Sequence, residues 1–353
     1  MNKRNVCILF GGVTPEHEVS LRSAECILTN IDRERNNVFA VGITRKGEWL
    51  YFPGSDYSRL PADTWMNEPD CCRCIISPSR GDGLILFQNG GTVHVPIDVV
   101  FPVMHGANGE DGSIQGLMQI AGIPCVGPGV AASACCMDKT QTKLIIDRTD
   151  VSQAKWHLVT AEDFSDDSTD VMDAVEEQFE YPVFVKPAGT GSSVGITKAH
   201  NRKELLSALI LALKFDRKVL VEEFIPGREI EIAVLGNHDP VASICGEIIS
   251  GAEFYDYDAK YITDTSRAVI PADLTPEESD QARAAAITVY KAMGCRGLSR
   301  VDFFVTDNSR VVFNEINTLP GFTSISMYPK LFVAGGMTIP ALIERILELA
   351  EQE

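Results

Sequence analysis

Short hydrophobic runs alternate with amphipathic segments through the first third of the chain. Apolar runs with the length and β-branched content of buried strands lie at residues 6–10, 38–43 and 99–103. Segments whose apolar residues recur every three or four positions, as on one face of a helix, lie at residues 19–31 and 113–121. This alternation predicts a parallel, helix-covered sheet over residues 1–128.

The alternation of strand-like and helix-like segments is interrupted within the predicted first domain. Residues 47–95 are irregular and rich in Gly, Pro, Asp and Cys, which predicts hairpins or an insertion. Beyond residue 128 a smaller α/β unit with a strand at 183–186 comes first, and strand-rich sequence follows. Further helices are predicted at residues 138–148, 202–214, 276–293 and 340–350. We therefore expect three domains, over residues 1–128, 129–221 and 222–353.

The composition narrows the class of protein. A chain of 353 residues with 45% hydrophobic and 23% charged residues has enough apolar material for two or three globular domains. Its net charge of −18 argues against general binding to nucleic acids or anionic membranes, since both interactions need a cationic surface. No window has the apolar length of a transmembrane helix.

The ten cysteines predict free thiols and no disulfide framework. The first residues lead directly into the strand-like run at 6–10, with no secretory leader before it. The cysteines at 71–74 and 135–136 lack the paired C-x2-C spacing of a zinc site. We therefore expect a protein of the reducing cytoplasm.

Three oxygen-bearing side chains near the C-terminus occupy two neighbouring strand-like runs. Asp302 ends an Arg-Val-Asp sequence, and Glu315 and Asn317 lie in the sequence Asn-Glu-Ile-Asn-Thr-Leu-Pro-Gly-Phe. Residues two apart on a strand point to one face, and carboxylate and amide oxygens are the ligands that Mg²⁺ bridged to ATP phosphates requires. The alternative is a polar strand edge that ends in a Pro-Gly turn.

Two lysines and a glycine-rich loop predict a phosphate site in the middle unit. Lys139 follows a helix-capping aspartate, and Lys186 ends a buried strand, where a cation needs an anionic partner. The sequence Gly-Thr-Gly-Ser-Ser-Val-Gly at 189–195 offers flexible backbone N–H donors to phosphate. It lacks the Gly-Lys-Ser/Thr of a Walker A loop, which argues against a P-loop ATPase. A solvated surface charge is the alternative for Lys139.

Two further loops follow strands of the predicted parallel sheet, where α/β proteins usually bind ligands. The first contains Glu16, whose alternative role is to cap the next helix together with Glu18. The second contains His105 and three glycines that permit close backbone approach, and its alternative is an ordinary loop with an exposed histidine. A long segment at 246–266 is predicted to be a lid, against the alternative of a surface hairpin.

Taken in the order in which they occur along the chain, these motifs resemble the D-alanine:D-alanine ligase family of ATP-grasp enzymes. The resemblance covers nearly all 353 residues. It implies an α/β fold of three domains: an N-terminal Rossmann-like domain with a parallel sheet, and two α+β domains that enclose ATP. It implies ATP-dependent joining of two D-alanines through an acyl phosphate for peptidoglycan synthesis. It also implies ATP and two Mg²⁺ or Mn²⁺ ions as cofactors, and a homodimer that binds neither nucleic acid nor membrane.

The same resemblance implies roles for individual residues. The groups at the reacting atoms are Glu16, Ser192, Tyr261, Arg300 and Gly321. The residues that bind the amino acids are His105, Ser326 and Met327. The residues that hold the nucleotide are Lys139, Lys186, Ser193, Glu222, Glu223, Ile225, Glu229 and Lys260. The metal ligands are Asp302, Glu315 and Asn317.

Three other interpretations stay open. Resistance-type relatives that make D-alanyl-D-lactate or D-alanyl-D-serine tend to have arginine where this chain has Met327, which favours D-alanine as the second substrate. Another ATP-grasp ligase would share the metal ligands and lysines but would not need Glu16 or Tyr261. A nucleotide-binding regulator without catalysis is the alternative from a different class, and the joint presence of Arg300 and the metal ligands argues against it.

Overall fold

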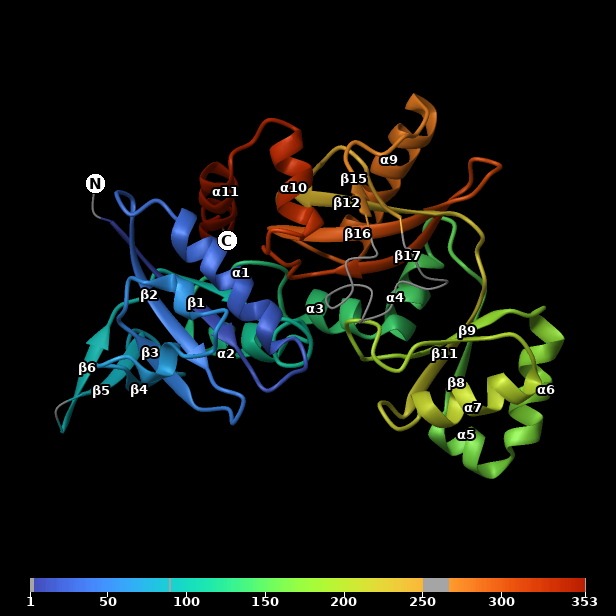
Figure 1. Cartoon of the computed structure of the whole chain (residues 1–353), viewed down its shortest axis with the longest axis horizontal. Coiled ribbons are helices and arrows are strands. Elements are labelled where there is room, and N and C mark those ends of the chain that lie inside the picture. The colour runs from blue at the N-terminus through green and yellow to red at the C-terminus, as the bar shows by residue number, and fades with distance from the viewer. Residues whose placement is uncertain (1–2, 89, 250–266, 353) are drawn as a thin grey trace.

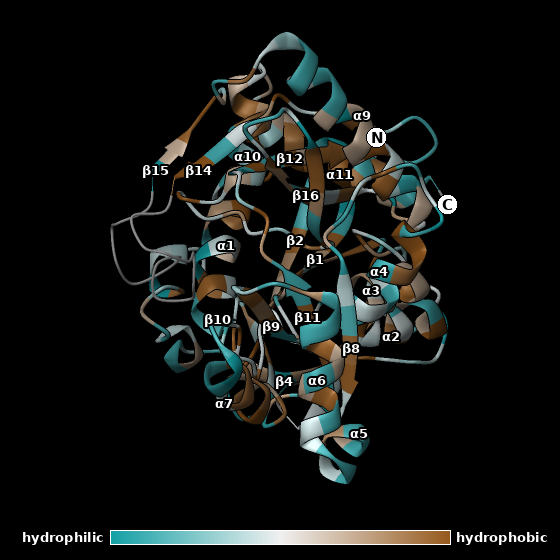
Figure 2. Ribbon diagram, turned by 90° about the vertical axis from the view of Figure 1, so that its right-hand side faces the viewer, coloured by the Kyte–Doolittle hydropathy of each residue, from teal (hydrophilic) through white to brown (hydrophobic). Residues whose placement is uncertain are grey.

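Three β-sheets, each covered by helices, make up the described part of the chain (Figure 1). The computed structural model describes residues 3–88, 90–249 and 267–352. In Figure 2 the central strands such as β1 and β16 are largely hydrophobic, and hydrophilic residues gather on outer helices such as α5. Within the described residues, no helix combines the length and the apolar composition that crossing a membrane requires.

The N-terminal sheet has a parallel centre and an antiparallel extension. Its order is β6-β5-β4-β3-β2-β1-β7, and β1 (Arg4–Gly11) pairs in parallel with β2 (Asn36–Ile43) and β7 (Val99–Val103). These are the three strands that the hydrophobic runs predict. The irregular region 47–95 forms hairpins and two short 3-10 helices. Its elements are β3 (Trp49–Phe52), η1 (Tyr57–Arg59), η2 (Trp65–Asn67), β4 (Cys72–Ile76), β5 (Leu84–Gln88) and β6 (Gly91–Val95).

Two predicted helices cover the parallel strands. Helix α1 (His17–Asn30) buries the apolar residues at positions 21, 24, 27 and 28, whose spacing places them on one helix face. Helix α2 (Ser113–Ala121) begins at its predicted first residue and buries Ile114 and Met118 in the same way. Both helices therefore follow from the hydrophobic spacing of the sequence.

Two short helices lead from the N-terminal sheet to the middle unit. They are α3 (Val130–Met137), which sequence periodicity did not predict, and α4 (Lys139–Ile146). Asp138 caps α4, since its Oδ1 accepts hydrogen bonds from the N–H groups of Thr140 and Gln141 at 2.9 and 3.3 Å. The cap fixes Lys139 as the first residue of α4.

The middle unit contains a four-stranded antiparallel sheet in the order β10-β9-β11-β8. Its strands are β8 (Trp156–Thr160), β9 (Val183–Pro187), β10 (Thr197–Ala199) and β11 (Lys218–Glu223). Its helices are α5 (Ala161–Asp166), α6 (Ser168–Gln178) and α7 (Arg202–Ala212). On β9 and β11, Lys186 pairs with Leu220 and Phe184 pairs with Glu222. Lys186 and Glu222 are therefore diagonal neighbours on one face of the sheet.

The third sheet is also antiparallel, in the order β15-β14-β12-β16-β17 with β13 paired to β12. Its strands are β12 (Arg228–Leu235), β13 (Val241–Ala242), β14 (Gly246–Ile249), β15 (Arg267–Val269), β16 (Leu298–Val305) and β17 (Val311–Asn317). Helix α9 (Pro276–Ala292) packs on the face that carries Ile230 and Ile232, and helix α10 (Met327–Ala334) packs on the face of Ala233 and Leu235. The alternation of strand side chains thus places the two helices on opposite faces.

The C-terminal helices return to the N-terminal sheet. Figure 1 shows α11 (Ile339–Glu351) beside α1, and Leu342 and Ile346 lie in one core with Ile8 of β1. Glu344 of α11 accepts a hydrogen bond from Arg4 Nη2 at 2.8 Å. This shared core joins the first and last of the three predicted domains, whose boundaries stay a prediction.

Most of the predicted lid lies outside the described residues. Residues 246–249 at its start form strand β14. Residues 250–266, which include Lys260 and Tyr261, are not among the residues described.

Candidate active site

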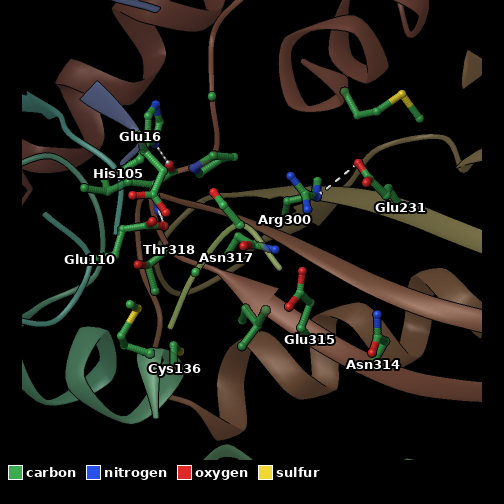
Figure 3. A pocket seen from close by; sticks show the side chains of 18 of the residues that line it. Glu16, His105, Glu110, Cys136, Glu231, Arg300, Asn314, Glu315, Asn317 and Thr318 are labelled. Atoms are coloured by element: carbon green, nitrogen blue, oxygen red, sulfur yellow. Dashed lines mark hydrogen bonds and ion pairs between the residues drawn. The ribbon is translucent and has the colours of Figure 1, made fainter. Parts of the chain in front are cut away.

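A pocket lies where the three sheets meet (Figure 3). Its walls come from the start of α1, the loop after β7, helix α4, the glycine loop after β9 and the hairpin of β16 and β17. The predicted site residues that line it are Glu16, His105, Lys139, Ser192, Glu222, Arg300, Glu315, Asn317, Gly321, Ser326 and Met327. Folding thus brings both ends of the chain and its middle to one place.

Three lysines form what we call the cation cluster: Lys139 and Lys143 line this pocket, and Lys186 contacts the pocket residue Glu222. Lys139 Nζ donates a hydrogen bond to the backbone oxygen of Thr190 at 2.6 Å, which ties α4 to the glycine loop. Lys143 lies one turn further along α4, on the same helix face, and also lines the pocket. The cluster therefore combines one helix with one strand.

Glu222 joins two members of the cation cluster. Its Oε1 lies 3.2 Å from Lys143 Nζ, and its Oε2 accepts a hydrogen bond from Lys186 Nζ at 2.8 Å. Burial alone would raise the pKa of Glu222, but the two lysines lower it to about 2. Glu222 is therefore a carboxylate at any pH near neutrality. Lys186 Nζ also lies 3.4 Å from Asn314 Oδ1 of β17.

The hairpin of β16 and β17 carries the predicted metal ligands beside a buried arginine. Asp302 pairs with Glu315 in the strand register, and Arg300 pairs with Asn317. Arg300 donates from Nε and Nη2 to the two oxygens of Asp302 at 2.8 and 2.7 Å, and its Nε lies 3.0 Å from Glu231 Oε2 (Figure 3). Burial alone would lower the pKa of Arg300, but these carboxylates raise it well above its usual value. Arg300 is thus permanently cationic.

The predicted metal ligands stand together but contain only two carboxylates. Asp302 is 1% exposed, and its Oδ2 accepts a hydrogen bond from Asn317 Nδ2 at 3.1 Å. Among the residues that the structure describes, no group of three or more His, Cys, Asp or Glu side chains is placed to hold a metal ion. An ion between Asp302 and Glu315 would need the amide oxygen of Asn317 and oxygens of a bound ligand to complete its shell.

Three residues from two loops form the opposite side of the pocket, which we call the loop junction: Glu16, His105 and Glu110. Glu16 is 4% exposed at the start of α1. A Cβ placed on Gly106 would lie 2.9 Å from its Oε2, and one on Gly191 would lie 3.1 Å from its Oε1. Glycine at both positions lets two loops approach the carboxylate closely. Figure 3 shows Glu16 beside His105 and Glu110.

His105 is buried and neutral. Its Nδ1 lies 3.0 Å from the backbone oxygen of Leu319, which can only accept, so Nδ1 carries the proton and Nε2 is the acceptor. Nε2 lies 3.4 Å from Ser23 Oγ, which accepts a hydrogen bond from the N–H of Phe322 at 3.1 Å. Burial lowers the pKa of His105 to about 4. The histidine thus connects α1 to the segment that follows β17.

Glu110 bridges the same two regions. Its Oε2 accepts a hydrogen bond from the N–H of Gly106 at 2.8 Å, and its Oε1 accepts one from the N–H of Leu319 at 3.2 Å. Burial raises the pKa of Glu110 to about 7 against the effect of these two donors, and the nearby Glu16 adds to the rise. Glu110 is therefore poised to titrate near neutral pH.

The segment after β17 closes the end of the pocket. A Cβ on Gly321 would lie 2.7 Å from Ser326 Oγ, so that only glycine allows this approach. Ser326 Oγ accepts a hydrogen bond from the N–H of Thr323 at 3.0 Å. Met327, the first residue of α10, is 4% exposed and its Cε packs against Gly246 of β14. The buried thioether of Met327 and the hydroxyl of Ser326 therefore form this end of the pocket.

Six predicted residues of the described part of the chain do not line the pocket. Lys186 and Asp302 reach it through Glu222 and Asn317. Glu223, at the end of β11, accepts a hydrogen bond from the N–H of Lys155 at 2.8 Å. Predicted residues that are partly buried nearby are Ser193, Ile225 and Glu229. Predicted residues that lie outside the described part of the chain are Lys260 and Tyr261.

Sequence reasoning did not single out three polar residues of the pocket: Glu110, Lys143 and Glu231. Lys143 could have been found from its position four residues after Lys139 on a predicted helix. Glu231 lies two residues after Glu229 on a strand, and therefore on the same face. Glu110 belongs to the Gly-Glu-Asp-Gly run beside His105, but its contact with Leu319 has no local signal in the sequence.

The chain matches known proteins over almost its whole length. The family models described as D-ala D-ala ligase N-terminus and C-terminus match residues 5–128 and 145–348. The D-alanine–D-alanine ligase of Acetivibrio thermocellus is 50% identical over 364 residues, which cover 99% of this chain and 96% of that protein. The solved VanG D-Ala:D-Ser ligase from Enterococcus faecalis superposes with a TM-score of 0.90 at 36% identity, covering 99% of this chain and all of the other.

The D-alanine-D-alanine ligase from Coxiella burnetii superposes with a TM-score of 0.86 at 33% identity, covering 99% of this chain and 94% of the other. Both family models are matched in chain order, and the curated relative covers the pocket residues from α1 to α10. This chain therefore belongs to the D-alanine–D-alanine ligase family.

Proposed function

We propose that this chain joins two D-alanines into D-alanyl-D-alanine with ATP as the phosphoryl donor. The observation that carries the proposal is that Lys139 and Lys143 of the cation cluster share one pocket with the β16–β17 hairpin and the loop junction. Such a pocket can hold a polyanion beside an amino acid, which phosphorylation of a carboxylate requires. The curated relative at 50% identity is named for the same activity.

The nucleotide is proposed to lie between the second and third sheets, with its phosphates at the cation cluster. Two ammonium groups around one carboxylate leave a net positive charge that suits a polyanion. The residues proposed to hold the nucleotide are Lys139, Lys186, Ser193, Glu222, Glu223, Ile225, Glu229 and, outside the described residues, Lys260.

Two Mg²⁺ ions, or Mn²⁺ in their place, are proposed at Asp302, Glu315 and Asn317. The donor set fits a hard cation, because all three side chains offer oxygen and two of them face each other across the hairpin. Bound metal would neutralise charge on the phosphate oxygens. Chelation should abolish ADP release, and added Mg²⁺ should restore it.

The first D-alanine is proposed to bind at the loop junction. Its ammonium would pair with the carboxylate of Glu16, which is otherwise enclosed by two glycines. His105, which is neutral, and Ser192 would contact the same substrate, with Tyr261 from outside the described residues. The second D-alanine is proposed to lie against Ser326 and Met327, which line the same pocket.

The chemistry is proposed to run in two steps. A carboxylate oxygen of the first D-alanine attacks the γ-phosphorus, and the bond to the bridging oxygen breaks, which gives an acyl phosphate and ADP. The amine of the second D-alanine, after losing a proton, attacks the acyl carbon, and phosphate leaves with the electron pair of the C–O bond. Arg300 and the N–H of Gly321 would donate to the tetrahedral oxyanion.

D-Alanyl-D-serine is the second candidate product, because VanG, which superposes closely on this chain, is named a D-Ala:D-Ser ligase. The higher identity to a D-alanine–D-alanine ligase favours D-alanine. Met327 argues against a D-hydroxy acid such as D-lactate as the second substrate, since a buried thioether offers no cation to it. We also propose that the chain acts in the cytoplasm as a homodimer, as the family resemblance implies.

Product analysis with ATP, Mg²⁺ and a panel of D-amino and D-hydroxy acids tests the proposal. We expect ADP release that depends on D-alanine, and D-alanyl-D-alanine as the main product at neutral pH. Some D-alanyl-D-serine should form at high D-serine, since pockets of this kind reject an added hydroxyl by only about 100-fold. ADP release that no D-amino acid stimulates would contradict the proposal, and D-alanyl-D-lactate as the main product would move the chain to the resistance group.

A further inference from the structure

Lys143 is a buried cation that the proposed reaction does not yet use. Its side chain is 2% exposed on α4, and it lines the pocket between Lys139 and Glu222. A lysine is almost never fully buried unless it is paired. The partner is Glu222 Oε1 at 3.2 Å.

Lys143 and Lys186 hold Glu222 from two elements. Lys143 approaches one carboxylate oxygen from α4, and Lys186 approaches the other from β9 at 2.8 Å. Glu222 itself is 4% exposed on β11. The carboxylate is therefore fixed between a helix and a sheet that are far apart in the chain.

The charges of Lys143, Glu222 and Lys186, which we call the triad, do not cancel. Two ammonium groups and one carboxylate leave one positive charge, and the triad lies beside the Lys139 side chain on the pocket wall. Without Lys143, the pair of Glu222 and Lys186 would be neutral. The excess charge that faces the pocket would then be lost from this position.

We propose that Lys143 is a positioning residue of the nucleotide site, which holds Glu222 so that Lys186 remains directed toward the phosphates and keeps the triad cationic. The ligand is the polyphosphate of a nucleoside triphosphate. This proposal rests on the proposed function, because it assumes that the cation cluster binds ATP. It adds a residue that contributes through Glu222 and Lys186.

A purely structural lysine would be an unusual choice at this place. Replacing a buried ion pair by apolar side chains of similar volume is often neutral or stabilising, so fold stability alone does not favour the triad. Burial lowers the pKa of Lys143, and Glu222 is the main group that opposes this shift. The triad is better explained by the charge that it presents.

Binding of Mg·ATP to purified variants tests the proposal by calorimetry. Lys143→Met should weaken ATP binding by about 10-fold or more, since one nearby charge is lost from a partly desolvated site. It should raise KM for ATP and leave KM for D-alanine within about twofold. Ile146→Val, which shortens another fully buried side chain of α4, is the matched control and should bind ATP normally.

A second substitution tests whether the charge of the side chain at position 143 determines ATP affinity. Lys143→Arg keeps a positive charge and a donor toward Glu222 at the same position. It should bind ATP more tightly than Lys143→Met and within about threefold of the parent. Where Lys143→Met does not fold, Lys143→Gln takes its place with the same expectations.

Two results would overturn the proposal. One is normal ATP binding by a folded Lys143→Met or Lys143→Gln variant. The other is a folded Lys143→Arg variant that binds ATP no better than Lys143→Met, which would show that the charge of Lys143 is not what matters. Failure of the parent protein to bind ATP would instead contradict the proposed function, so the two failures can be told apart.

Discussion

The cation cluster and the loop junction are built from different interactions, although both contribute side chains to the same pocket. In the cation cluster, charged side chains bind charged side chains, as in the contacts of Glu222 with Lys143 and Lys186. In the loop junction, side chains bind main-chain groups, as in the contacts of His105 and Glu110 with Leu319.

This difference indicates which property of a ligand each side of the pocket can recognise. Ion pairs can exchange partners when an anion arrives, so the geometry of the cation cluster depends on charge balance. Main-chain hydrogen bonds fix the loop junction by shape, because they tie the segment after β17 to the loop after β7 whether or not a ligand is bound. We therefore expect the cation cluster to set nucleotide affinity and the loop junction to select the amino acid.

The largest effect is expected at the β16–β17 hairpin, which lies between the two sides. Glu315→Gln should lower kcat for ADP release by at least about 100-fold, because the carboxylate is proposed to serve metal-bound phosphate. Asp307→Asn removes a carboxylate from the exposed turn of the same hairpin and should leave kcat unchanged. Near-normal turnover by Glu315→Gln would exclude the metal assignment.

Asp302→Asn is a weaker test of the same site. Asp302 also closes the bidentate pair with Arg300, and removing one partner of a buried ion pair commonly costs about 3–5 kcal/mol of stability. Loss of activity in that variant would therefore mix a catalytic effect with a folding effect.

The next effect is expected at Glu16, the one loop-junction residue proposed to recognise charge. Glu16→Gln should lower kcat/KM for D-alanine by about 10- to 100-fold, as for the loss of a hydrogen bond between charged groups, and should leave ATP affinity unchanged. Glu18→Gln, on the same helix with its side chain 63% exposed, is the matched control. If Glu16→Gln weakened ATP binding as much as D-alanine use, the two sides would not be separable.

Much of this pocket could be predicted from the sequence, because its residues lie in local motifs. The hydrophobic runs predicted β1, β2 and β7, and the order of the motifs predicted the ligase family and the ATP-grasp fold, which the comparisons confirm. The spacing of Glu315 and Asn317 also predicted that they share a strand with Asp302 beside it. The local spacing of residues was sufficient to predict the role of a residue wherever that role depends on a single helix or strand.

The missed features depend on contacts between distant elements. Burial of Lys143 requires β11 to bring Glu222 against α4. Nothing in the sequence of α4 predicts that contact. Helix α10 carries Pro329 in its first turn and a weakly periodic sequence, so its burial against β12 decides the helix. The raised pKa of Glu110 depends on burial among segments that are distant in the chain, including the segment after β17, which contacts it through Leu319.

The last and smallest effect concerns pH, and it separates the two sides without any ligand. The two lysines that contact Glu222 lower its pKa to about 2, so this carboxylate beside the cation cluster stays ionised between pH 4.5 and 7.5. The pKa of Glu110 is raised from its ordinary 4.5 to about 7. Between these two values the folded chain holds a proton that the unfolded chain has lost. Glu110 therefore contributes stability that is fully present below pH 4.5 and is lost as the pH rises through 7.

His105 acts in the opposite direction. Its pKa is lowered from 6.5 to about 4, so the stability linked to its neutral form is present above pH 6.5 and is lost as the pH falls toward 4. In urea unfolding from pH 4.5 to 7.5, Glu110→Gln should remove the contribution that declines with pH, so the free energy of unfolding should rise more steeply than in the parent. Glu18→Gln should keep the parent's slope, because its side chain is exposed. An unchanged slope in Glu110→Gln would mean that Glu110 is ionised throughout this range, and the loop junction would then be as insensitive to pH as the cation cluster.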